Sequence, residues 1–371
     1  MKVLFVTYHY LHGNGGGVFA SRGFINAFSS LSEGMTLLCP QKGDAPPAGI
    51  DSRIRIIPVR ETRSKFRKAL SYLAGCIHRF FGVFDEVLSS DRFDTVVFDS
   101  CYVSRGLIGK AHLAGCRVIT IHHNYQCDYV RANEVFPGIL PTLFWTWISE
   151  RKAVRKSDLN LTLTAEDKEL LYRHYDPRRK SRIDVIGVFE YERKEMPASK
   201  SPVGDPVFII SGNLSMRQTE SPLLEWLDFC CPVLKEAIPA AVVLVAGKNP
   251  SDRLAERCRE CGVELIPSPA DMQAVLDRGR YYLCPASEGG GLKLRIMDGL
   301  KNGMPVLAHR AAARGYAPFL DRSVFCYTDA ESFRDALLRL VSMPYDREET
   351  IRLYREVFSY DAGVNRLRAL L

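Results

Sequence analysis

Short runs of apolar residues alternate with amphipathic segments along the chain. The runs are rich in Val, Ile, Leu and Phe, as expected of strands that helices cover on both faces. The expected strands are Lys2–Thr7, Met35–Cys39, Ile54–Pro58, Thr95–Phe98, Arg117–Ile121, Leu159–Leu163, Asp184–Val188, Val207–Ser211, Ala241–Ala246, Val263–Ile266, Tyr281–Cys284, Pro305–Ala308 and Val324–Tyr327. Helix-like segments separate most of these runs, so the pattern predicts an α/β fold with parallel sheets.

A polar, proline-rich segment, Glu190–Pro206, interrupts this series and has the composition of a linker. We therefore expect two doubly wound domains, residues 1–195 and residues 196–371. The final helix-like segment, Arg347–Leu371, could pack back on the first domain. Ligands of such sheets bind beyond the carboxyl ends of the strands, so a ligand is expected in a cleft between the two domains.

The composition is that of a globular protein. Of 371 residues, 46% are apolar and 25% are charged, and no apolar run approaches the length of a membrane span. The first residues do not have the pattern of a signal peptide. The eleven cysteines are an odd number and are expected to be reduced thiols. We therefore expect a cytoplasmic protein. Cys258 and Cys261 have a metal-like spacing but no second pair, which favours two thiols on a helix and its last turn.

The net charge of +7 is placed unevenly. Residues 1–195 hold 28 Lys and Arg and 21 Asp and Glu, a balance of +7 (28 − 21), so the remaining residues are balanced. Such an excess suggests an anionic partner for the first domain, such as a membrane surface, a phosphate-bearing acceptor or a nucleic acid. Because the excess is modest and no nucleic-acid-binding module is recognisable, we expect no nucleic acid.

A glycine-rich turn, residues 8–17, follows the first expected strand and leads to a helix expected to begin near Val18. Successive glycines at a helix start leave backbone N–H groups open to an anion or a sugar. The spacing fits neither a dinucleotide fingerprint nor a nucleotide-triphosphate loop. If the ligands are a sugar donor and the acceptor of that sugar, Gly16 and Gly17 are candidate donor contacts and His12 and Gly15 are candidate acceptor contacts; the alternative is a plain surface loop.

A histidine pair, His122 and His123, lies at the end of another expected strand, and Asn124 follows it. A histidine at this position could orient or deprotonate a sugar hydroxyl, since its pKa lies near neutrality. The alternative is two structural histidines with satisfied hydrogen bonds. Both histidines are candidate catalytic residues, and Asn124 is a candidate acceptor contact.

The segment Ser287–Val306 combines a glycine triplet, two basic residues and a carboxylate. The glycines are expected to open a helix that ends at Gly303, and a helix N-terminus can hold a diphosphate. The two basic residues place positive charge beside the diphosphate. A carboxylate about two turns into the helix could accept hydrogen bonds from ribose hydroxyls, so the segment predicts a nucleotide-sugar site. The alternative is a capped helix with surface charges. The candidate donor-binding residues are Glu288, Gly289, Gly290, Gly291, Leu292 and Asp298, and the candidate catalytic residues are Lys293 and Arg295.

This segment resembles the retaining GT-B glycosyltransferases of family four, the glycosyl transferases group 1. Many members carry Gly-Gly-Gly-x-Arg-x-Lys-x-x-Glu-Ala-x-x-x-Gly-x-Pro-Val, and here residues 289–298 with Gly303, Pro305 and Val306 match it. Other segments also resemble the family: Phe208–Ser215, Leu244–Pro250 and His123-Asn124. So do Trp147, Glu150 and Ala153, together with the Ser157-Asp158-Leu159 that follows them and leads into a strand. The resemblance covers nearly the whole chain and is strongest over residues 207–308.

The resemblance implies a GT-B fold of two Rossmann-like domains and transfer, with retention, from a UDP- or GDP-sugar to a glycan or lipid-linked acceptor. It implies a role in polysaccharide or lipopolysaccharide assembly, an acceptor-binding first domain and no protein cofactor. It also suggests donor contacts at Gly212, Asn213, Arg217 and Gly247. The absence of an Asp-x-Asp motif agrees with diphosphate binding without a metal. In two departures, Asp298 replaces the ribose-binding Glu, and Gly290 stands where many members have an earlier Glu.

The basic, aromatic-rich stretch Arg60–Phe84 could rest on an anionic membrane at its cytoplasmic face and bring a lipid-linked acceptor to the first domain. The alternative is a helix with an apolar core face and solvated Lys and Arg. Two other functions also fit the sequence. One is a nucleotide-sugar hydrolase or epimerase that needs no acceptor. The other is a GT-B-shaped binding subunit without turnover.

Overall fold

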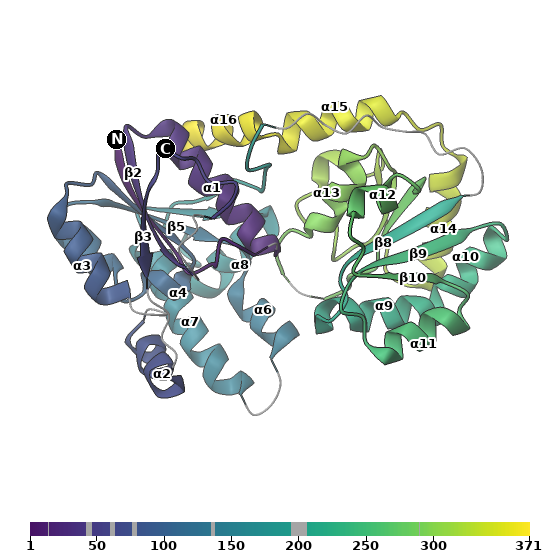
Figure 1. The fold of residues 1–371 in the computed structure, drawn as a ribbon, viewed down its shortest axis with the longest axis horizontal. Helices are drawn as coiled ribbons and strands as arrows, with labels where there is room; N and C mark the ends of the chain where they lie inside the picture. The colour runs from purple at the N-terminus through teal and green to yellow at the C-terminus, as the bar shows by residue number, and fades with distance from the viewer. Residues whose placement is uncertain are drawn as a thin grey trace. The chain divides into compact units, whose positions relative to one another are not determined.

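The computed structural model describes residues 1–13, 15–41, 47–59, 64–75, 80–134, 138–193, 206–288 and 290–371. The chain divides into two compact units (Figure 1). Unit 1 comprises Met1–Arg193 together with Val357–Leu371, and unit 2 comprises Lys194–Glu356. The boundary expected near residue 195 lies outside the described residues.

Unit 1 is built on a seven-stranded parallel sheet of order β3-β2-β1-β4-β5-β6-β7. Its strands are β1 Lys2–Thr7, β2 Gly34–Pro40, β3 Arg55–Val59, β4 Thr95–Asp99, β5 Arg117–His122, β6 Leu159–Thr162 and β7 Ile183–Val185. Its helices are α1 Gly16–Leu31, α2 Lys65–Ala74, α3 Phe80–Ser90, α4 Cys101–Ser104, α5 Ile108–Leu113, α6 Gln126–Asn133, α7 Ile139–Lys156, α8 Ala165–Tyr175 and α16 Tyr360–Leu370. The central strands are apolar on both faces because helices cover both sides of the sheet.

Unit 2 contains a six-stranded parallel sheet of order β10-β9-β8-β11-β12-β13. Its strands are β8 Val207–Asn213, β9 Val242–Lys248, β10 Glu264–Pro267, β11 Tyr281–Cys284, β12 Val306–His309 and β13 Val324–Tyr327. Its helices are α9 Arg217–Phe229, α10 Cys231–Ala237, α11 Asp252–Glu260, α12 Met272–Leu276, α13 Leu294–Lys301, α14 Ala330–Ser342 and α15 Arg347–Phe358, whose last residues fall in unit 1, with a short 3-10 turn, Ala317–Phe319.

Each sheet has one point where the order of its strands reverses. In unit 1 the chain runs outward from β1 through β2 to β3 and then returns to β4 on the other side of β1. In unit 2 it runs outward from β8 through β9 to β10 and returns to β11. Such a reversal separates the loops at the carboxyl ends of the two central strands, which leaves room for a ligand. The two switch points, β1/β4 and β8/β11, are therefore where ligand groups are expected.

The last helix, α16, belongs to unit 1 and packs on α1. Its Gly363 lies on the ring of Phe189, where a Cβ would come within 2.0 Å of a ring atom. The Arg366 guanidinium donates to the carbonyl of Ile186 at 3.0 Å, and the Tyr360 hydroxyl donates to the carbonyl of Asn26 at 2.9 Å. These contacts attach α16 to α1 and to the segment after β7.

The predicted strands and the two-sheet α/β fold are confirmed, with shifts of one to three residues at strand ends. The helix expected near Val18 begins at Gly16, so the glycines form its first turn. The helix expected to open at the glycine triplet begins only at Leu294, capped by Lys293, and ends before Gly303, which has φ +63°. Asp298 is therefore about one turn into α13 and not two. Within the described residues, no helix is long and apolar enough to cross a membrane.

Candidate functional site

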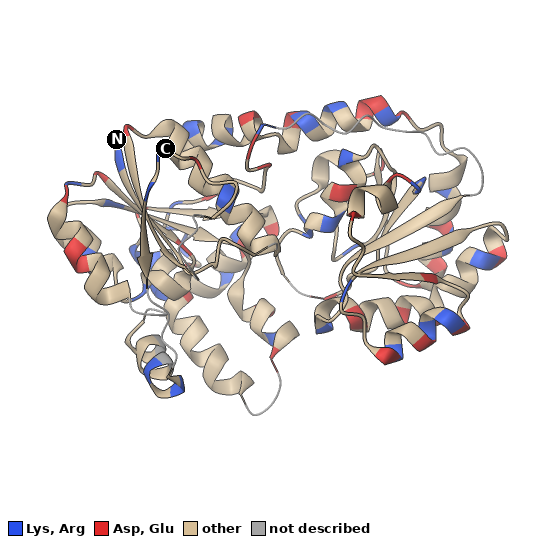
Figure 2. Ribbon diagram, in the orientation of Figure 1, with Lys and Arg blue, Asp and Glu red and all other residues tan. Residues whose placement is uncertain are grey.

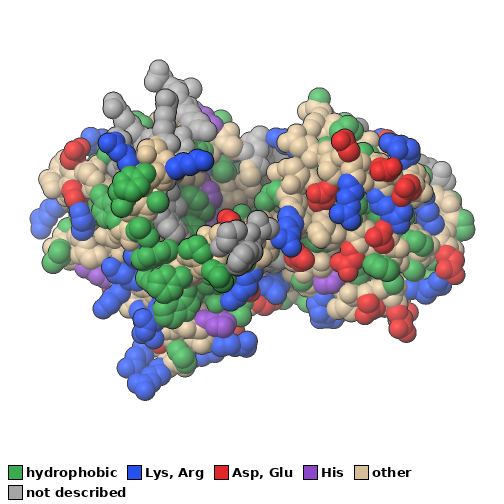
Figure 3. Space-filling model, turned by 90° about the horizontal axis from the view of Figure 1, so that it is seen from below, with side chains coloured by type: hydrophobic (Ala, Val, Ile, Leu, Met, Phe, Trp, Pro, Cys, Tyr) green, Lys and Arg blue, Asp and Glu red, His purple; other side chains and the backbone are tan. Residues whose placement is uncertain are grey.

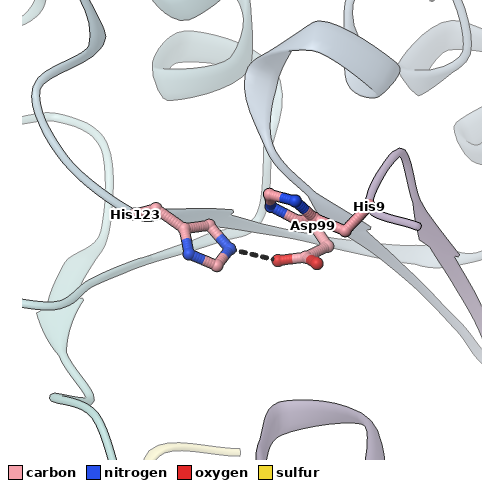
Figure 4. Close-up of side chains that lie close together, drawn as sticks. All are labelled: His9, Asp99 and His123. Atoms are coloured by element: carbon pink, nitrogen blue, oxygen red, sulfur yellow. Dashed lines mark hydrogen bonds and ion pairs between the residues drawn. The ribbon is translucent and has the colours of Figure 1, made fainter. Parts of the chain in front are cut away.

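The switch point of unit 1 brings together side chains from three strand ends. Register places Thr7 of β1 beside Asp99 of β4, and Asp99 beside Ile121 of β5, two residues before His123. His9 follows β1 after one further residue. Figure 4 shows the imidazoles of His9 and His123 next to the Asp99 carboxylate, with a ring nitrogen of His123 pointing at it. The ligand atoms of these three side chains lie within 4.8 Å of one another.

Asp99 is held firmly in this group. Its Oδ2 accepts hydrogen bonds from the Thr7 hydroxyl at 2.7 Å and the Ser21 hydroxyl at 2.5 Å, and its Oδ1 lies 2.5 Å from Nε2 of His123. Burial alone would raise the pKa of Asp99, but the charge and hydrogen bond of His123 outweigh it and bring that pKa down to about 2. The group is therefore ionised at neutral pH.

The ionised carboxylate fixes the tautomer of its neighbour. Because Asp99 can only accept, Nε2 of His123 must carry the proton in their hydrogen bond. A neutral His123 then presents Nδ1 as its proton-accepting atom. The strand end is strained as well, since Ser100, directly after Asp99, has φ +123°. Such strain is often found at functional sites.

The imidazole of His9 packs against Gly17, where a side chain would not fit. A Cβ on Gly17 would lie 2.7 Å from Cε1 of the His9 ring, so the first turn of α1 can approach the imidazole because residue 17 has no side chain. Burial lowers the pKa of His9 to about 4, although the charge of Asp99 opposes this shift. Among the described residues, its buried Nε2 has no hydrogen-bond partner. His9 is thus a neutral imidazole with an unsatisfied nitrogen.

The other candidates of unit 1 lie around this group. Gly15 caps α1, Gly16 starts it, and His12 is exposed in the preceding turn, which Arg22 holds by donating to the carbonyls of Leu11 and Gly13. Asn124 is half-buried, and its Oδ1 has no partner among the described residues. Asn14, in the same turn, lies outside them.

The two adjacent histidines of the sequence prediction have different surroundings. His123 faces the switch point, with 13% of its side chain exposed. His122 is buried, with Nε2 3.0 Å from Oδ1 of Asn160 and Nδ1 3.9 Å from Glu150. Glu150 in turn accepts from the backbone N–H of Gln126 and from the Tyr175 hydroxyl, each at 2.9 Å. His122 therefore belongs to a buried network that fixes the loop carrying His123.

The switch point of unit 2 is built from glycines and cations. Gly212 and Gly247 are register partners at the ends of β8 and β9, and a Cβ on Gly247 would lie 1.8 Å from the Gly212 carbonyl oxygen. A Cβ on Gly212 would lie 2.8 Å from Cζ of Arg295, so the guanidinium rests on the backbone of residue 212. The Arg295 guanidinium also donates to the Thr219 hydroxyl in the first turn of α9. The backbone can approach the guanidinium because residue 212 carries no side chain.

The second cation, Lys293, lies at the start of α13. Its ammonium donates to the carbonyl of Gly290 at 3.3 Å, and its own carbonyl accepts from the Tyr316 hydroxyl at 2.8 Å. Its charge and that of Arg295 both reach the Cys284 thiol, where they oppose the rise in pKa that burial causes. Gly291 has φ +71°, so the turn before Lys293 needs a glycine. The positive charge is thus concentrated beyond the end of β11.

The remaining donor candidates differ in position. Asp298 is exposed on α13, and its charge reaches the buried hydroxyl of Tyr282, which bonds to Ser211. Arg217, Asn213 and Glu288 are exposed, and Asn213 accepts from the Ser215 hydroxyl at 2.9 Å. Gly290 and Leu292 are half-buried, and Gly289 lies outside the described residues.

Sequence reasoning missed His9 and Asp99 as site residues. Asp99 ends β4 and His9 follows β1; these strands are neighbours in the sheet but far apart in the chain, so spacing does not link the two residues. The available signal was an ionisable residue at the end of each apolar strand. Two imidazoles and a carboxylate are also a ligand set for divalent transition metals, so this group could hold an ion.

Cys258 and Cys261 are, as expected, on a helix and its last turn.

The C-terminal part of the chain matches a known family. Residues 205–343 match the family model described as "Glycosyl transferases group 1". An uncharacterized 44.6 kDa protein in the cps region of Klebsiella pneumoniae is 22% identical over 251 residues, which are 62% of this chain. The match spans only 61% of the length of that relative.

Solved structures with a similar fold cover the whole chain. HepE from Anabaena, solved in complex with UDP, has a TM-score of 0.69 at 12% identity, covering 100% of this chain and 99% of its own. WaaG, a glycosyltransferase involved in lipopolysaccharide biosynthesis, has a TM-score of 0.64 at 15% identity, covering 99% and 98%. The chain thus has the GT-B fold of these proteins, and its residues 205–343 are similar to the glycosyl transferases group 1.

Proposed function

We propose that the protein transfers a sugar from a nucleoside-diphosphate sugar to an acceptor hydroxyl. The observation that carries the proposal is the cationic switch point of unit 2, where Arg295 rests on Gly212 and Lys293 caps α13. HepE, which has the same fold, was solved with UDP, which supports a uridine nucleotide as the first candidate.

In this proposal the donor diphosphate binds beside Arg295 and Lys293. As the bond between the anomeric carbon and the diphosphate oxygen breaks, negative charge grows on the leaving group. Fixed cations at that position stabilise the charge without having to reorganise. Asp298, exposed about one turn into α13, accepts hydrogen bonds from the ribose hydroxyls. Its stem is one carbon shorter than that of Glu, so the ribose must lie closer to the helix.

The switch point of unit 1 acts on the acceptor hydroxyl in this proposal. The hydroxyl needs a proton acceptor when its oxygen bonds to the anomeric carbon, and Nδ1 of His123 can take the proton because Asp99 holds the proton on Nε2. His9, neutral and with an unpartnered Nε2 among the described residues, can bond to the same sugar. Asn124 offers an amide oxygen close by in the chain.

Retention of the anomeric configuration, independence of metal and a role in surface polysaccharide or lipopolysaccharide assembly complete the proposal. The role is supported by the cps-region relative and by the fold of WaaG. Retention and metal independence rest on the family resemblance of residues 289–306. The acceptor is then a glycan or lipid-linked sugar, and no nucleic acid or protein cofactor takes part.

The test is a calorimetric titration with UDP, GDP, ADP and dTDP in the presence of a chelator, followed by incubation with the sugar nucleotides of the base that binds. We expect one nucleotide to bind in the wild type and much more weakly in Arg295→Ala. NMR of the transferred sugar shows whether the anomeric configuration is kept. Absence of binding by all four would contradict the proposal, and free sugar released without acceptor would favour a hydrolase.

A further inference from the structure

Between Leu140 and Glu150, helix α7 buries polar side chains and exposes large apolar ones, whereas its last turns bury Ala153 and Val154. The residues that face the body of unit 1 include Thr146, Ser149 and Glu150, which are at most 3% exposed. The outward residues Leu140, Phe144 and Trp147 are 62%, 56% and 41% exposed. A surface helix normally turns its apolar stripe to the core and its polar residues to water. The outer face of α7 is therefore suited to an apolar environment.

The inward polar residues of α7 have partners that explain their burial. The Thr146 hydroxyl lies 3.1 Å from the Tyr102 hydroxyl. Glu150 accepts from the Gln126 N–H and the Tyr175 hydroxyl. Because these bonds fix the rotation of the helix, Leu140, Phe144 and Trp147, spaced i, i+4 and i+7, must share the outward face.

Helix α2 repeats the same outward stripe. Phe66, Leu70 and Leu73 have the spacing i, i+4 and i+7 and are 73%, 48% and 42% exposed. Arg105 joins this helix to α7, since its guanidinium donates to the carbonyl of Leu73 at 2.6 Å and lies 5.2 Å from the ring centre of Trp145. We call the six exposed side chains the α2–α7 apolar face: Phe66, Leu70, Leu73, Leu140, Phe144 and Trp147. Figure 3, seen from the side of these helices, shows hydrophobic side chains gathered on unit 1 beside Lys and Arg.

The exposed charged side chains that the structure describes on α2 and α7 are all basic, whereas Glu134 at the end of the neighbouring α6 is an exposed carboxylate. On α2, Lys65 and Arg67 are exposed, and Figure 2 shows basic and no acidic residues along this helix. On α7, Lys152 and Lys156 are exposed, and the Arg151 guanidinium lies 5.3 Å from the ring centre of Trp147. Among the described side chains of the two helices, Glu150 is the one carboxylate, and it is buried. An apolar face with a basic border matches the interface of an anionic bilayer.

We propose that the α2–α7 apolar face docks unit 1 on the surface of an anionic lipid bilayer, with its apolar side chains among the acyl chains and its Lys and Arg at the headgroups. This surface differs from the stretch Arg60–Phe84 that the sequence suggested. Phe80 and Phe84 of α3 are fully buried in the core, Arg60, Arg63 and Arg79 lie outside the described residues, and α7 had not been included. The proposal stands independently of glycosyl transfer.

The experiment is co-sedimentation of the full chain with vesicles of phosphatidylcholine alone or mixed equally with phosphatidylglycerol. We expect binding to the mixed vesicles at low salt, weakened by high salt. Phe144→Ser and Phe66→Ser should each reduce partitioning about tenfold, since each removes an exposed aromatic side chain that the bilayer would bury. Arg67→Glu should reduce it about fivefold or more because it removes an attraction to anionic headgroups.

Phe229→Ser is the matched control, because Phe229 in unit 2 is 62% exposed, close to the 56% of Phe144. It should leave partitioning unchanged. Quenching of tryptophan fluorescence by brominated lipid should be seen in the wild type and be strongly reduced in Trp147→Phe. Circular dichroism and thermal melting confirm that each variant folds, and Phe66 and Phe144 lie on separate helices, so failure of one variant to fold leaves the other as a test.

Three results would overturn the proposal. The first is no binding to mixed vesicles at low salt. The second is an equal loss of binding in Phe229→Ser. The third is a stable dimer, shown by light scattering, that Phe144→Ser turns into a monomer while neither form binds vesicles; the face would then bind a second copy of the chain.

Discussion

The two sheets reverse their strand order in the same way, yet the side chains beyond the reversal differ. In unit 1 the end of β4 and the loops after β1 and β5 supply an ionised carboxylate, Asp99, and two histidines, His9 and His123, of which His123 carries its proton on Nε2. In unit 2 the corresponding loops supply glycines that expose backbone and two cations, Lys293 and Arg295. Proton transfer needs pKa values set apart by their surroundings, whereas charge stabilisation needs fixed positive groups. In the proposed reaction, the comparison therefore gives proton transfer to unit 1 and leaving-group stabilisation to unit 2.

The strongest test of this division is Arg295→Ala. We expect the rate of transfer to fall about 10³-fold because the leaving diphosphate loses a fixed cation. Steady-state kinetics with saturating acceptor measures the effect. Arg278→Ala is the control, since Arg278 pairs with Glu264 away from the switch point. If Arg295→Ala transferred the sugar at the wild-type rate, unit 2 would not stabilise the leaving group through this residue.

On the side of unit 1, His123→Asn should lower the rate about 10²-fold, because the acceptor hydroxyl loses its proton acceptor. Nucleotide binding measured by calorimetry should stay unchanged. The control is His112→Asn, which alters another histidine bonded to a carboxylate, that of Asp158 at 3.2 Å. Weaker nucleotide binding in His123→Asn would show that the division between the units is not strict.

Stability should depend on pH through His9. Its pKa is about 4 in the fold and about 6.5 when unfolded, so between these values the unfolded chain binds more protons. The free energy of unfolding should therefore rise with pH from about 4 to about 6.5 and then level, by about 3 kcal/mol for this group. Denaturant melts of wild type and His9→Asn measure it, and the variant should show a flatter rise. His309 of unit 2, whose pKa burial also lowers, remains in both proteins and contributes equally.

The smallest expected effect concerns ribose. Asp298→Ala should weaken nucleotide binding about tenfold, through loss of hydrogen bonds to a charged group. Asp298→Glu, which restores the longer stem common in the resembled family, should bind at least as tightly as wild type. Calorimetry measures both, and unchanged affinity in Asp298→Ala would place the ribose elsewhere.

The strands and both glycine turns could be predicted because each is written in consecutive residues. Runs such as Val3–Val6 are apolar on both faces, and that pattern needs no knowledge of neighbours. The pairing of Asp99 with His123 and His9 could not be predicted, because it depends on β4 lying between β1 and β5. The outward face of α7 could not be predicted either. Periodicity identifies an apolar stripe on the helix, but the side that faces the core depends on where the hydrogen-bond partners of Thr146 and Glu150 lie.

The return of α16 to unit 1 has a consequence for the order of folding during synthesis. Unit 2 is one continuous stretch of chain, Lys194–Glu356, whereas unit 1 is completed only by Val357–Leu371. As the chain leaves the ribosome, unit 2 can close while Phe189 still lacks Gly363 and the carbonyl of Asn26 still lacks Tyr360. Synthesis of unit 1 begins first, but this unit is completed last. A nascent chain stopped before residue 357 would expose the face of α1 that α16 later covers.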